Sequence, residues 1–303
     1  DTLLGGQGYY RGSSILVTGT AGTGKTTIAA HFAQATCKRG ERCLYVASEE
    51  SPQQVLRNMK SIGVDLAPFR KDDRLRFYAV RPTAYGLEMH LVKLYDWIKE
   101  FQPSTVIIDP MSNLILSGTL TQTKLFFIRL IDLLKSLQIT VLLTNLTAGQ
   151  YALEQTEVGV SSLMDTWLEI RTLETNGERN RVLYILKSRG MNHSNQVREF
   201  RLTPSGAELL DVYVGQGTVL TGTARVVQAA QEQQERLSYQ QTLERKQREF
   251  ERKQTVVQAQ ILAMQAQLEA EQEELTILVQ QDQAHQKTLL QDRSLLAQLR
   301  RAD

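Results

Sequence analysis

Short apolar runs alternate with amphipathic stretches over the first half of the chain. The runs at residues 14–18, 43–47, 75–80, 105–108 and 140–144 have the length and composition of buried strands. The stretches between them have the spacing of helices. Strands and helices in alternation predict an α/β fold, with a mainly parallel sheet covered on both faces.

Three further apolar runs, at residues 166–171, 181–187 and 197–202, follow at short spacing without helical patterns between them. Such spacing favours antiparallel strands that extend one edge of the sheet. Asn176 and Gly177 lie between the first two runs and indicate a hairpin turn.

The pattern changes near residue 222. All six prolines lie at or before Pro204 and the last glycine is Gly222, so residues 223–303 contain neither of the strong helix breakers. We therefore expect two parts, a globular domain at residues 1–222 and a helical tail at residues 223–303.

Apolar side chains recur every seven residues in the tail, which is typical of a coiled coil. One heptad position holds Leu243, Phe250, Val257, Met264, Leu278 and Leu299, and the other holds Ile261, Leu268, Leu275, Leu289 and Leu296. Polar residues interrupt the same positions at Gln247, Gln254, Glu271, Asp282, His285 and Asp292. Pairing of tails is the favoured interpretation, and a lone solvated helix is the alternative.

Composition narrows the function little. The 303 residues are 42% hydrophobic, and 35 Lys and Arg against 33 Asp and Glu give a net charge of +2. This balance gives no reason to expect bulk electrostatic capture of nucleic acid or membrane. No apolar run reaches the roughly 18 residues of a membrane span. Cys37 and Cys43 lack metal-ligand spacing and are expected to be reduced structural thiols, so we expect a cytoplasmic protein. Asp1 opens the chain in place of Met, which suggests a fragment or a processed chain.

The clearest chemistry lies directly after the first strand. Residues 19–26 read Gly-Thr-Ala-Gly-Thr-Gly-Lys-Thr, which matches G-x-x-x-x-G-K-T between a strand and a helix. Backbone N–H groups of such a loop surround phosphate oxygens, and the helix N-terminus adds a favourable dipole. We therefore predict a RecA-like P-loop ATPase that binds ATP.

Different side chains of this loop are expected to contact the phosphates of ATP and Mg²⁺. Lys25 is expected to contact the β and γ phosphates, and the Thr26 hydroxyl to hold Mg²⁺. The remaining predicted nucleotide contacts are Thr20, Gly22, Thr23, Gly24 and Thr27. Asp109, at the end of the apolar run Val106 to Ile108, would supply the acidic metal contact, although Asp also ends many strands without binding anything.

Two adjacent carboxylates, Glu49 and Glu50, follow the second strand at the edge of the sheet where ligands of open α/β folds bind. Glu49 is predicted to accept a proton from the group that attacks the γ-phosphorus, with Glu50 in support and as a further metal contact. The alternative is that one of them is a solvated loop charge or caps the helix that starts near Pro52.

Beyond these motifs, three short segments resemble the KaiC family of circadian-clock ATPases and autokinases. They are residues 3–6 (Leu-Leu-Gly-Gly), 49–51 (Glu-Glu-Ser) and 187–190 (Lys-Ser-Arg-Gly). The resemblance covers residues 1 to about 225 and is closest to the second, kinase-bearing ATPase copy. It implies a hexameric ring with ATP held between subunits.

The resemblance also assigns residues that spacing alone leaves unremarked. Residues 156–162 and the following Asp165 resemble the family's phosphoacceptor segment, so Ser161 and Ser162 match its two acceptors, and Thr156 matches a nearby threonine. The family carries Ser then Thr where this chain carries two serines. Lys187 and Arg189 match basic residues that reach a neighbour's γ-phosphate, and Arg181 matches another basic position of the family; a solvated hairpin tip is the alternative for Lys187 and Arg189.

Two departures from the family bear on partners. The sequence contains no first ATPase copy, either because it is a fragment or because the protein has one domain. In the family KaiB binds that first copy, so a KaiB-like partner stays possible. The long heptad tail replaces the short extension where KaiA binds and so puts KaiA binding in doubt. We expect the tails to join rings.

The leading hypothesis is an autophosphorylating serine/threonine kinase with ATPase activity. A DNA-handling ATPase of the same superfamily and a non-kinase scaffold gated by ATP are the alternatives. The near-neutral charge and the lack of a basic, aromatic-rich loop count against nucleic acid.

Overall fold

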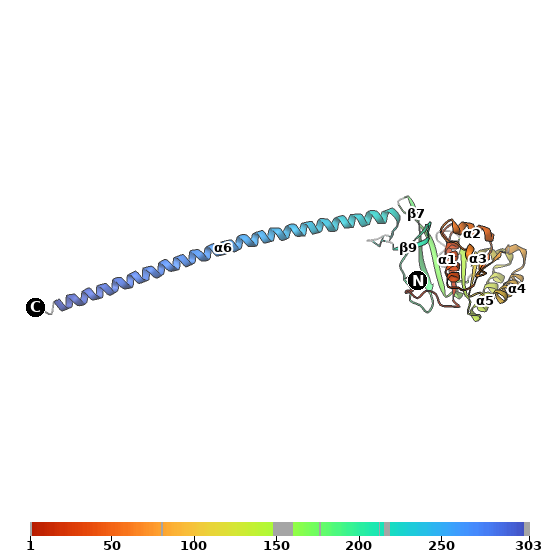
Figure 1. Ribbon diagram of the computed structural model, residues 1–303, viewed down its shortest axis with the longest axis horizontal. Helices are drawn as coiled ribbons and strands as arrows, with labels where there is room; N and C mark the ends of the chain where they lie inside the picture. The colour runs from red at the N-terminus through yellow and green to blue at the C-terminus, as the bar shows by residue number, and fades with distance from the viewer. Residues whose placement is uncertain are drawn as a thin grey trace. The chain divides into compact units, whose positions relative to one another are not determined.

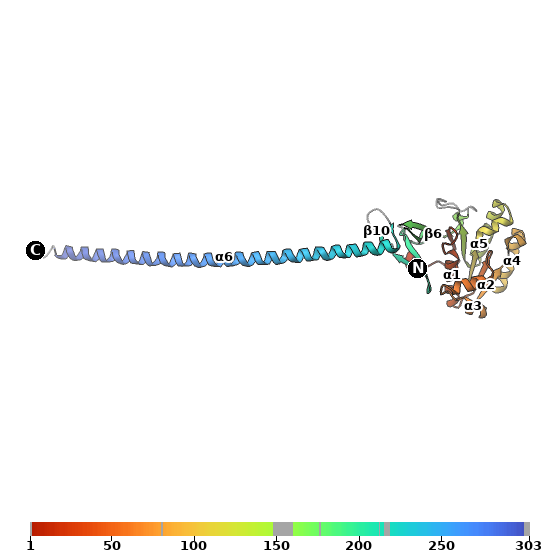
Figure 2. The same ribbon diagram turned by 90° about the horizontal axis from the view of Figure 1, so that it is seen from above.

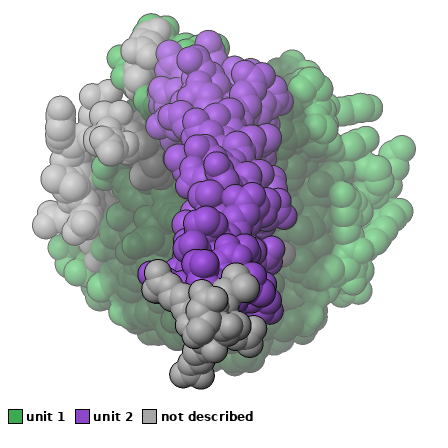
Figure 3. Space-filling view, turned by 90° about the vertical axis from the view of Figure 1, so that its left-hand side faces the viewer, with its two compact units in different colours: residues 1–227 green, residues 228–303 purple. Residues whose placement is uncertain are grey.

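The computed structural model describes residues 2–79, 81–147, 160–175, 177–211, 213–214 and 219–299. It divides the chain into two compact units, residues 1–227 and 228–303 (Figure 3). The first unit is built around a nine-stranded sheet, and the second is helical (Figures 1 and 2). No helix in the described ranges is long and apolar enough to cross a membrane.

The sheet has the strand order β3-β2-β4-β5-β1-β6-β7-β8-β9. Its strands are β1 (Ser14–Gly19), β2 (Cys43–Ala47), β3 (Leu75–Ala79), β4 (Thr105–Asp109), β5 (Thr140–Leu146), β6 (Thr166–Thr175), β7 (Glu178–Ser188), β8 (Arg198–Thr203) and β9 (Gly206–Asp211). The first six are mutually parallel, and β7, β8 and β9 continue the sheet in antiparallel pairs. The predicted α/β fold with an antiparallel edge is confirmed.

The three later runs are antiparallel to one another, as expected, because β6 pairs with β7 and β7 with β8. Spacing in the sequence did not predict which strand joins them to the parallel part of the sheet: β6 pairs parallel to β1, with Ile15 opposite Thr166. The chain between Leu146 and Thr166 is long enough for the crossover that parallel strands need. The hairpin between β6 and β7 is confirmed by their pairing, with Gly177 at φ 77°; Asn176 and Val80 lie outside the described residues.

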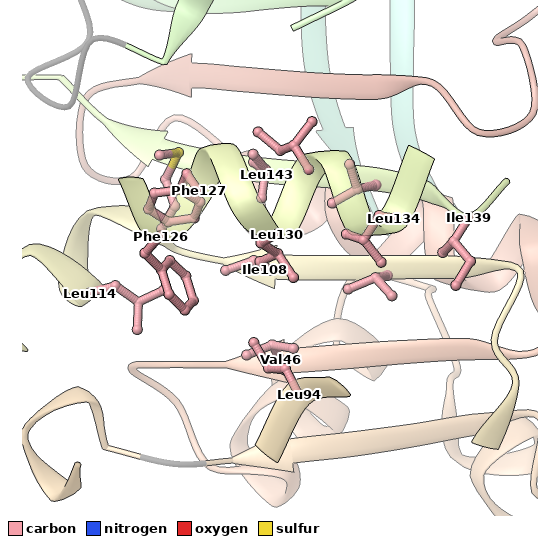
Figure 4. Packing of buried hydrophobic residues seen from close by; sticks show 14 of the residues in the cluster. Val46, Leu94, Ile108, Leu114, Phe126, Phe127, Leu130, Leu134, Ile139 and Leu143 are labelled. Atoms are coloured by element: carbon pink, nitrogen blue, oxygen red, sulfur yellow. The ribbon is translucent and has the colours of Figure 1, made fainter. Parts of the chain in front are cut away.

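Helices cover both faces of the sheet. They are α1 (Lys25–Lys38), α2 (Pro52–Lys60), α3 (Ala67–Lys71), α4 (Leu87–Phe101) and α5 (Leu120–Ser136), with short 3-10 turns η1 (Thr2–Leu4), η2 (Pro82–Ala84), η3 (Met111–Ser117) and η4 (Ser161–Leu163). On one face Leu94 of α4 and Phe127 and Leu130 of α5 pack against β-strand residues such as Val46 and Ile108 (Figure 4).

The opposite face of the sheet is covered by α1 and α2. Ala29 and Ala33 of α1 are fully buried against Ile15 and Val17 of β1, and Val55 of α2 belongs to the same cluster. The small alanines let α1 approach the sheet closely. This contact fixes the turn that joins β1 to α1, where the phosphate-binding motif lies.

The tail forms one helix, α6 (Gly222–Leu299), preceded by a small pair of strands, β10 (Tyr213–Val214) and β11 (Val219–Leu220). The predicted long C-terminal helix is confirmed. Its heptad side chains are exposed in the single chain, for example Phe250 at 69% and Met264 at 74%. Pairing of tails and the functional boundary at residue 222 stay predictions, and the side chain of Leu299 lies outside the described residues.

Candidate active site

The loop between β1 and α1 adopts a backbone that depends on its glycines. Gly22 and Gly24 have φ angles of 74° and 102°, in the left-handed region that other residues rarely adopt. A Cβ atom on Gly24 would lie 2.7 Å from the Phe200 ring, and one on Gly19 would lie 2.6 Å from the Ile170 carbonyl oxygen. Strands β6 and β8 therefore hold the loop in place from one side.

Lys25 is the first residue of α1 and is 7% exposed. Its Nζ donates hydrogen bonds to the carbonyl oxygens of Gly19 at 2.9 Å and Thr20 at 2.7 Å. Burial lowers the pKa of Lys25, and the charges of Asp109 and Glu49 partly offset this effect. The ammonium group therefore lies on the loop itself and feels the charge of two acidic side chains.

The other predicted loop contacts surround the same turn. The Thr23 hydroxyl donates to the Thr20 carbonyl oxygen at 2.9 Å, which ties the loop across its width. Thr26 is half-buried in the first turn of α1, and Thr27 beside it is buried. Because the first N–H groups of a helix have no partner within it, this turn suits an anion.

Asp109 ends β4 and is 8% exposed. Its carboxylate accepts a hydrogen bond from the Tyr45 hydroxyl at 2.6 Å and another from the Thr144 hydroxyl. Burial raises the pKa of Tyr45, and the neighbouring Asp109 charge raises it further. Two donors thus fix the carboxylate at the carboxyl edge of the sheet, as a ligand for Mg²⁺ would require, since Mg²⁺ prefers one or two carboxylates together with phosphate oxygens.

Sequence reasoning missed Tyr45 and Thr144, although the strand periodicity contains the signal. In register, Ala47 of β2 lies opposite Asp109. Tyr45 lies two residues before Ala47, so its side chain is on the same face of the sheet as Asp109. Thr144, on the other neighbouring strand, completes the set from β5.

Glu49 and Glu50 follow β2 and face different groups. Glu49 is exposed, and its charge acts on Lys25. Glu50 is half-buried, accepts a hydrogen bond from Asn58 of α2 at 3.3 Å, and acts on Tyr45. The interpretation that one of them caps α2 is wrong, because the Ser51 side chain accepts from the backbone N–H of Gln54 in a capping box.

The predicted acceptors and basic residues lie together. Ser161, half-buried, and Ser162, exposed, open the turn η4. Lys187 Nζ donates to the Ser161 carbonyl oxygen at 3.1 Å, and the Arg189 guanidinium to that of Ser162 at 2.7 Å. Arg181 instead donates to the carbonyl oxygen of the loop residue Gly22 at 3.3 Å. Thr156 and residues 157–159 lie outside the described residues.

The predicted acceptors, Ser161 and Ser162, and the predicted phosphate-binding loop lie at opposite ends of β1. The loop follows Gly19, whereas Ser14 at the start of the strand donates to the Leu163 carbonyl oxygen at 3.2 Å and accepts from the Asp165 N–H at 2.9 Å. Five steps of about 3.3 Å along a strand place the two ends about 17 Å apart. Within one chain, Ser161 and Ser162 are therefore remote from the phosphate-binding loop.

Comparison with known proteins gives consistent matches. The model of the family described as "ATPase: KaiC" matches residues 1–212. The circadian clock protein KaiC2 of Synechocystis sp. (strain ATCC 27184 / PCC 6803 / Kazusa) is 60% identical over 302 residues, which cover 99% of this chain and 53% of the relative. KaiC3 of the same organism is 35% identical over 77% of this chain and 46% of its own length.

A third relative, the circadian clock oscillator protein KaiC of Parathermosynechococcus lividus, is 34% identical over 226 residues, or 74% of this chain and 41% of the relative. The chain thus spans about half the length of the curated relatives it matches.

Proposed function

The chain belongs to the KaiC family of ATPases, and from that premise we propose that it is an ATP-dependent serine autokinase and ATP hydrolase of a timing system, active as a ring in which ATP lies between subunits. The observation that supports transfer between subunits is the separation of Ser161 and Ser162 from the loop after Gly19 by the length of β1. A neighbouring chain can bring its own η4 turn to that loop. The ring is proposed to be a hexamer.

The reaction needs three contributions from one chain. The Gly19–Thr26 loop, including Lys25, binds the phosphates. Mg²⁺ would be held by Thr26 and Asp109, with Glu50 as a further contact, and when bound it would neutralise negative charge on the phosphates. Glu49 accepts the proton of the attacking hydroxyl. The serine Oγ forms the new bond to the γ-phosphorus while the bond to the β-γ bridging oxygen breaks, so ADP leaves and phosphoserine remains.

The neighbouring chain contributes the acceptor serine together with Lys187 and Arg189. Both cations lie at the amino end of β6, beside the acceptors and away from the loop of their own chain. Positive charge delivered across an interface stabilises phosphate charge in the transition state and makes activity depend on assembly. Action on a neighbour's ATP explains why Lys187 and Arg189 lie far from the phosphate-binding loop of their own chain.

Transfer between chains can be tested by mixing two inactive variants. Glu49→Gln keeps the acceptors and lacks the base, whereas the double variant Ser161→Ala/Ser162→Ala keeps the base and lacks the acceptors. We expect little label from γ-³²P-ATP in either variant alone, and label on the Glu49→Gln chains once the two are co-assembled. Mass spectrometry would locate the phosphate.

Each failure of this experiment has a definite meaning. Absence of label in assembled wild-type protein would favour the ATP-gated scaffold. Label on wild-type protein without complementation in the mixture would contradict transfer between chains. Salt-dependent binding of single-stranded DNA by the unlabelled protein would favour the DNA-handling alternative.

The tail is proposed to join rings through helix pairing. Its apolar heptad residues are about half-exposed or more in the single chain, including Leu243, Val257 and Leu268. Apolar residues that recur at heptad positions, even with polar interruptions, are typical of a helix-pairing interface.

A chain that ends at Val227 should therefore form a complex with half as many chains as the wild-type complex, counted from the mass measured by multi-angle light scattering. Ending there keeps Thr223, whose backbone and hydroxyl bind Glu178, and the compact unit of residues 1–227. An unchanged number of chains per complex would contradict the role of the tail.

A further inference from the structure

Three cations surround the turn η4 in the single chain. Lys187 and Arg189 bind the carbonyl oxygens of Ser161 and Ser162, and Lys135 Nζ lies 3.5 Å from the carbonyl oxygen of Leu163. We call Lys135, Lys187 and Arg189 the η4 cation cluster. All three donate to uncharged carbonyl groups of the segment that carries the proposed acceptors.

The charges of this cluster are only partly balanced. Asp165 pairs with Lys135 at 2.9 Å and accepts from the N–H and hydroxyl of Ser14. Burial opposes ionisation of Asp165, but these hydrogen bonds outweigh it and hold its pKa below the ordinary value. Among the described residues, the Asp165 carboxylate pairs with Lys135 alone, and the two other cations of the cluster, Lys187 and Arg189, have no ion pair.

The pKa of Lys187 is lowered in these surroundings. Burial lowers its pKa first, and the charges of Arg189 and Lys135 lower it further, while Asp165 partly offsets them. An added anion at this place would relieve the repulsion between Lys187 and Arg189. The positive charge of the cluster therefore favours an oxyanion. The Arg189 guanidinium also carries five N–H donors, which can bind several oxygens of such an anion.

The hydroxyl of Ser162, on the turn that the cluster contacts, can carry such an anion. This side chain is exposed, and Arg189 already contacts the backbone of the same residue. A phosphoserine carries a charge of about −1.5 to −2 at pH 7 and offers three strong acceptor oxygens. Hydrogen bonds from a guanidinium to phosphate are about twice as strong as those between neutral groups.

We propose that Lys187 and Arg189, with Lys135 beside them, form a receiving site for phosphoserine 162 of their own chain. The origin of that phosphate rests on the proposed autokinase function, but the site itself does not. Once Ser162 is phosphorylated, its phosphate competes with the neighbour's ATP for the same two cations. The product thereby withdraws the basic pair from the next catalytic site and slows further turnover there.

The test places phosphoserine at position 162 of the full chain during translation, through a reassigned stop codon, so that no kinase activity is needed. A ³¹P NMR titration then measures the second pKa of the phosphate, which is about 6 for an exposed phosphoserine. Nearby cations favour the dianion, so we expect this pKa to fall by about half a unit or more, since each unit corresponds to a tenfold shift between the two forms.

Variants assign the shift to the cluster. Arg189→Gln and Lys187→Gln should each return the pKa towards 6, and Arg189→Lys should keep most of the shift. The matched control is Arg179→Gln, on the same strand but 71% exposed and paired with Glu174; it should leave the pKa unchanged. A pKa near 6 in the parent, or a shift that survives both Gln substitutions, would overturn the proposal.

This result is separable from that of the mixing experiment. A lowered pKa that depends on Arg189, in a protein that never labels itself from ATP, would support the receiving site and reject the autokinase. Self-labelling with an ordinary phosphoserine pKa would do the reverse.

Discussion

Lys25→Ala is expected to reduce ATP hydrolysis by about 10²- to 10³-fold, the range for losing one group that stabilises transition-state charge. In the chain without ligand its ammonium group binds the Gly19 and Thr20 carbonyl oxygens, inside the loop that would surround the phosphates. Moving to the phosphates exchanges neutral acceptors for charged ones in a buried place, where electrostatic stabilisation of the transition state is large. The measurement is steady-state release of phosphate from ATP.

The matched control is Lys38→Ala, which removes an exposed lysine from the other end of the same helix. It should keep ATP hydrolysis within about twofold of the parent. Lys38 is solvated and lies about 20 Å from Lys25, because the helix rises 1.5 Å per residue. Thermal unfolding of both variants would verify that the fold is retained. A Lys25→Ala protein that hydrolyses ATP within about threefold of the parent would contradict the assignment of this lysine to the phosphates.

Much of the sheet could be predicted because its strands are buried on both faces. The boundaries of β2 agree with the apolar run at residues 43–47, since such a strand is apolar throughout and ends where polarity begins. The strand β9 (Gly206–Asp211) was missed because much of it is half-buried or exposed and it carries charged residues. Edge strands lack the signal that identifies central ones.

The direction of β6 could not be read from spacing. Whether a strand runs parallel or antiparallel to β1 depends on the path of the chain before it, and apolar content is the same in both cases. The consequence is functional, because the parallel direction places Ser161 and Ser162, which precede β6, at the end of β1 far from the phosphate-binding loop. Transfer between chains is proposed because this pairing separates the two serines from the loop of their own chain.

Site residues that belong to one contiguous motif could be predicted from the sequence, whereas contacts between residues of several strands could not. Residues 19–26 are contiguous, so their geometry follows from one strand, one turn and one helix. The support of Asp109 by Tyr45 and Thr144 joins three strands that are distant in sequence. Such contacts become visible only when strand order and register are known.

Glu49→Gln should lower the rate of phosphoryl transfer to Ser161 and Ser162 by about 10² to 10⁴-fold, the range typical of losing a general base. The amide has nearly the shape of the carboxylate but cannot accept the hydroxyl proton. Because Glu49 is exposed at the edge of the sheet, its loss should leave the fold intact, and ATP binding should change little. Single-turnover labelling from γ-³²P-ATP, with the nucleotide affinity measured separately, distinguishes these effects.

Glu50→Gln is the matched control, since it changes the adjacent carboxylate in the same way. Glu50 accepts a hydrogen bond from Asn58 of α2, and its charge raises the pKa of Tyr45, which donates to Asp109, so we assign it to the metal side of the site. We expect a loss below about tenfold, recovered in part by raised Mg²⁺, because a metal contact is replaceable by mass action and a base is not. If Glu50→Gln lowered the transfer rate more than Glu49→Gln at saturating Mg²⁺, the roles of the two carboxylates would have to be exchanged.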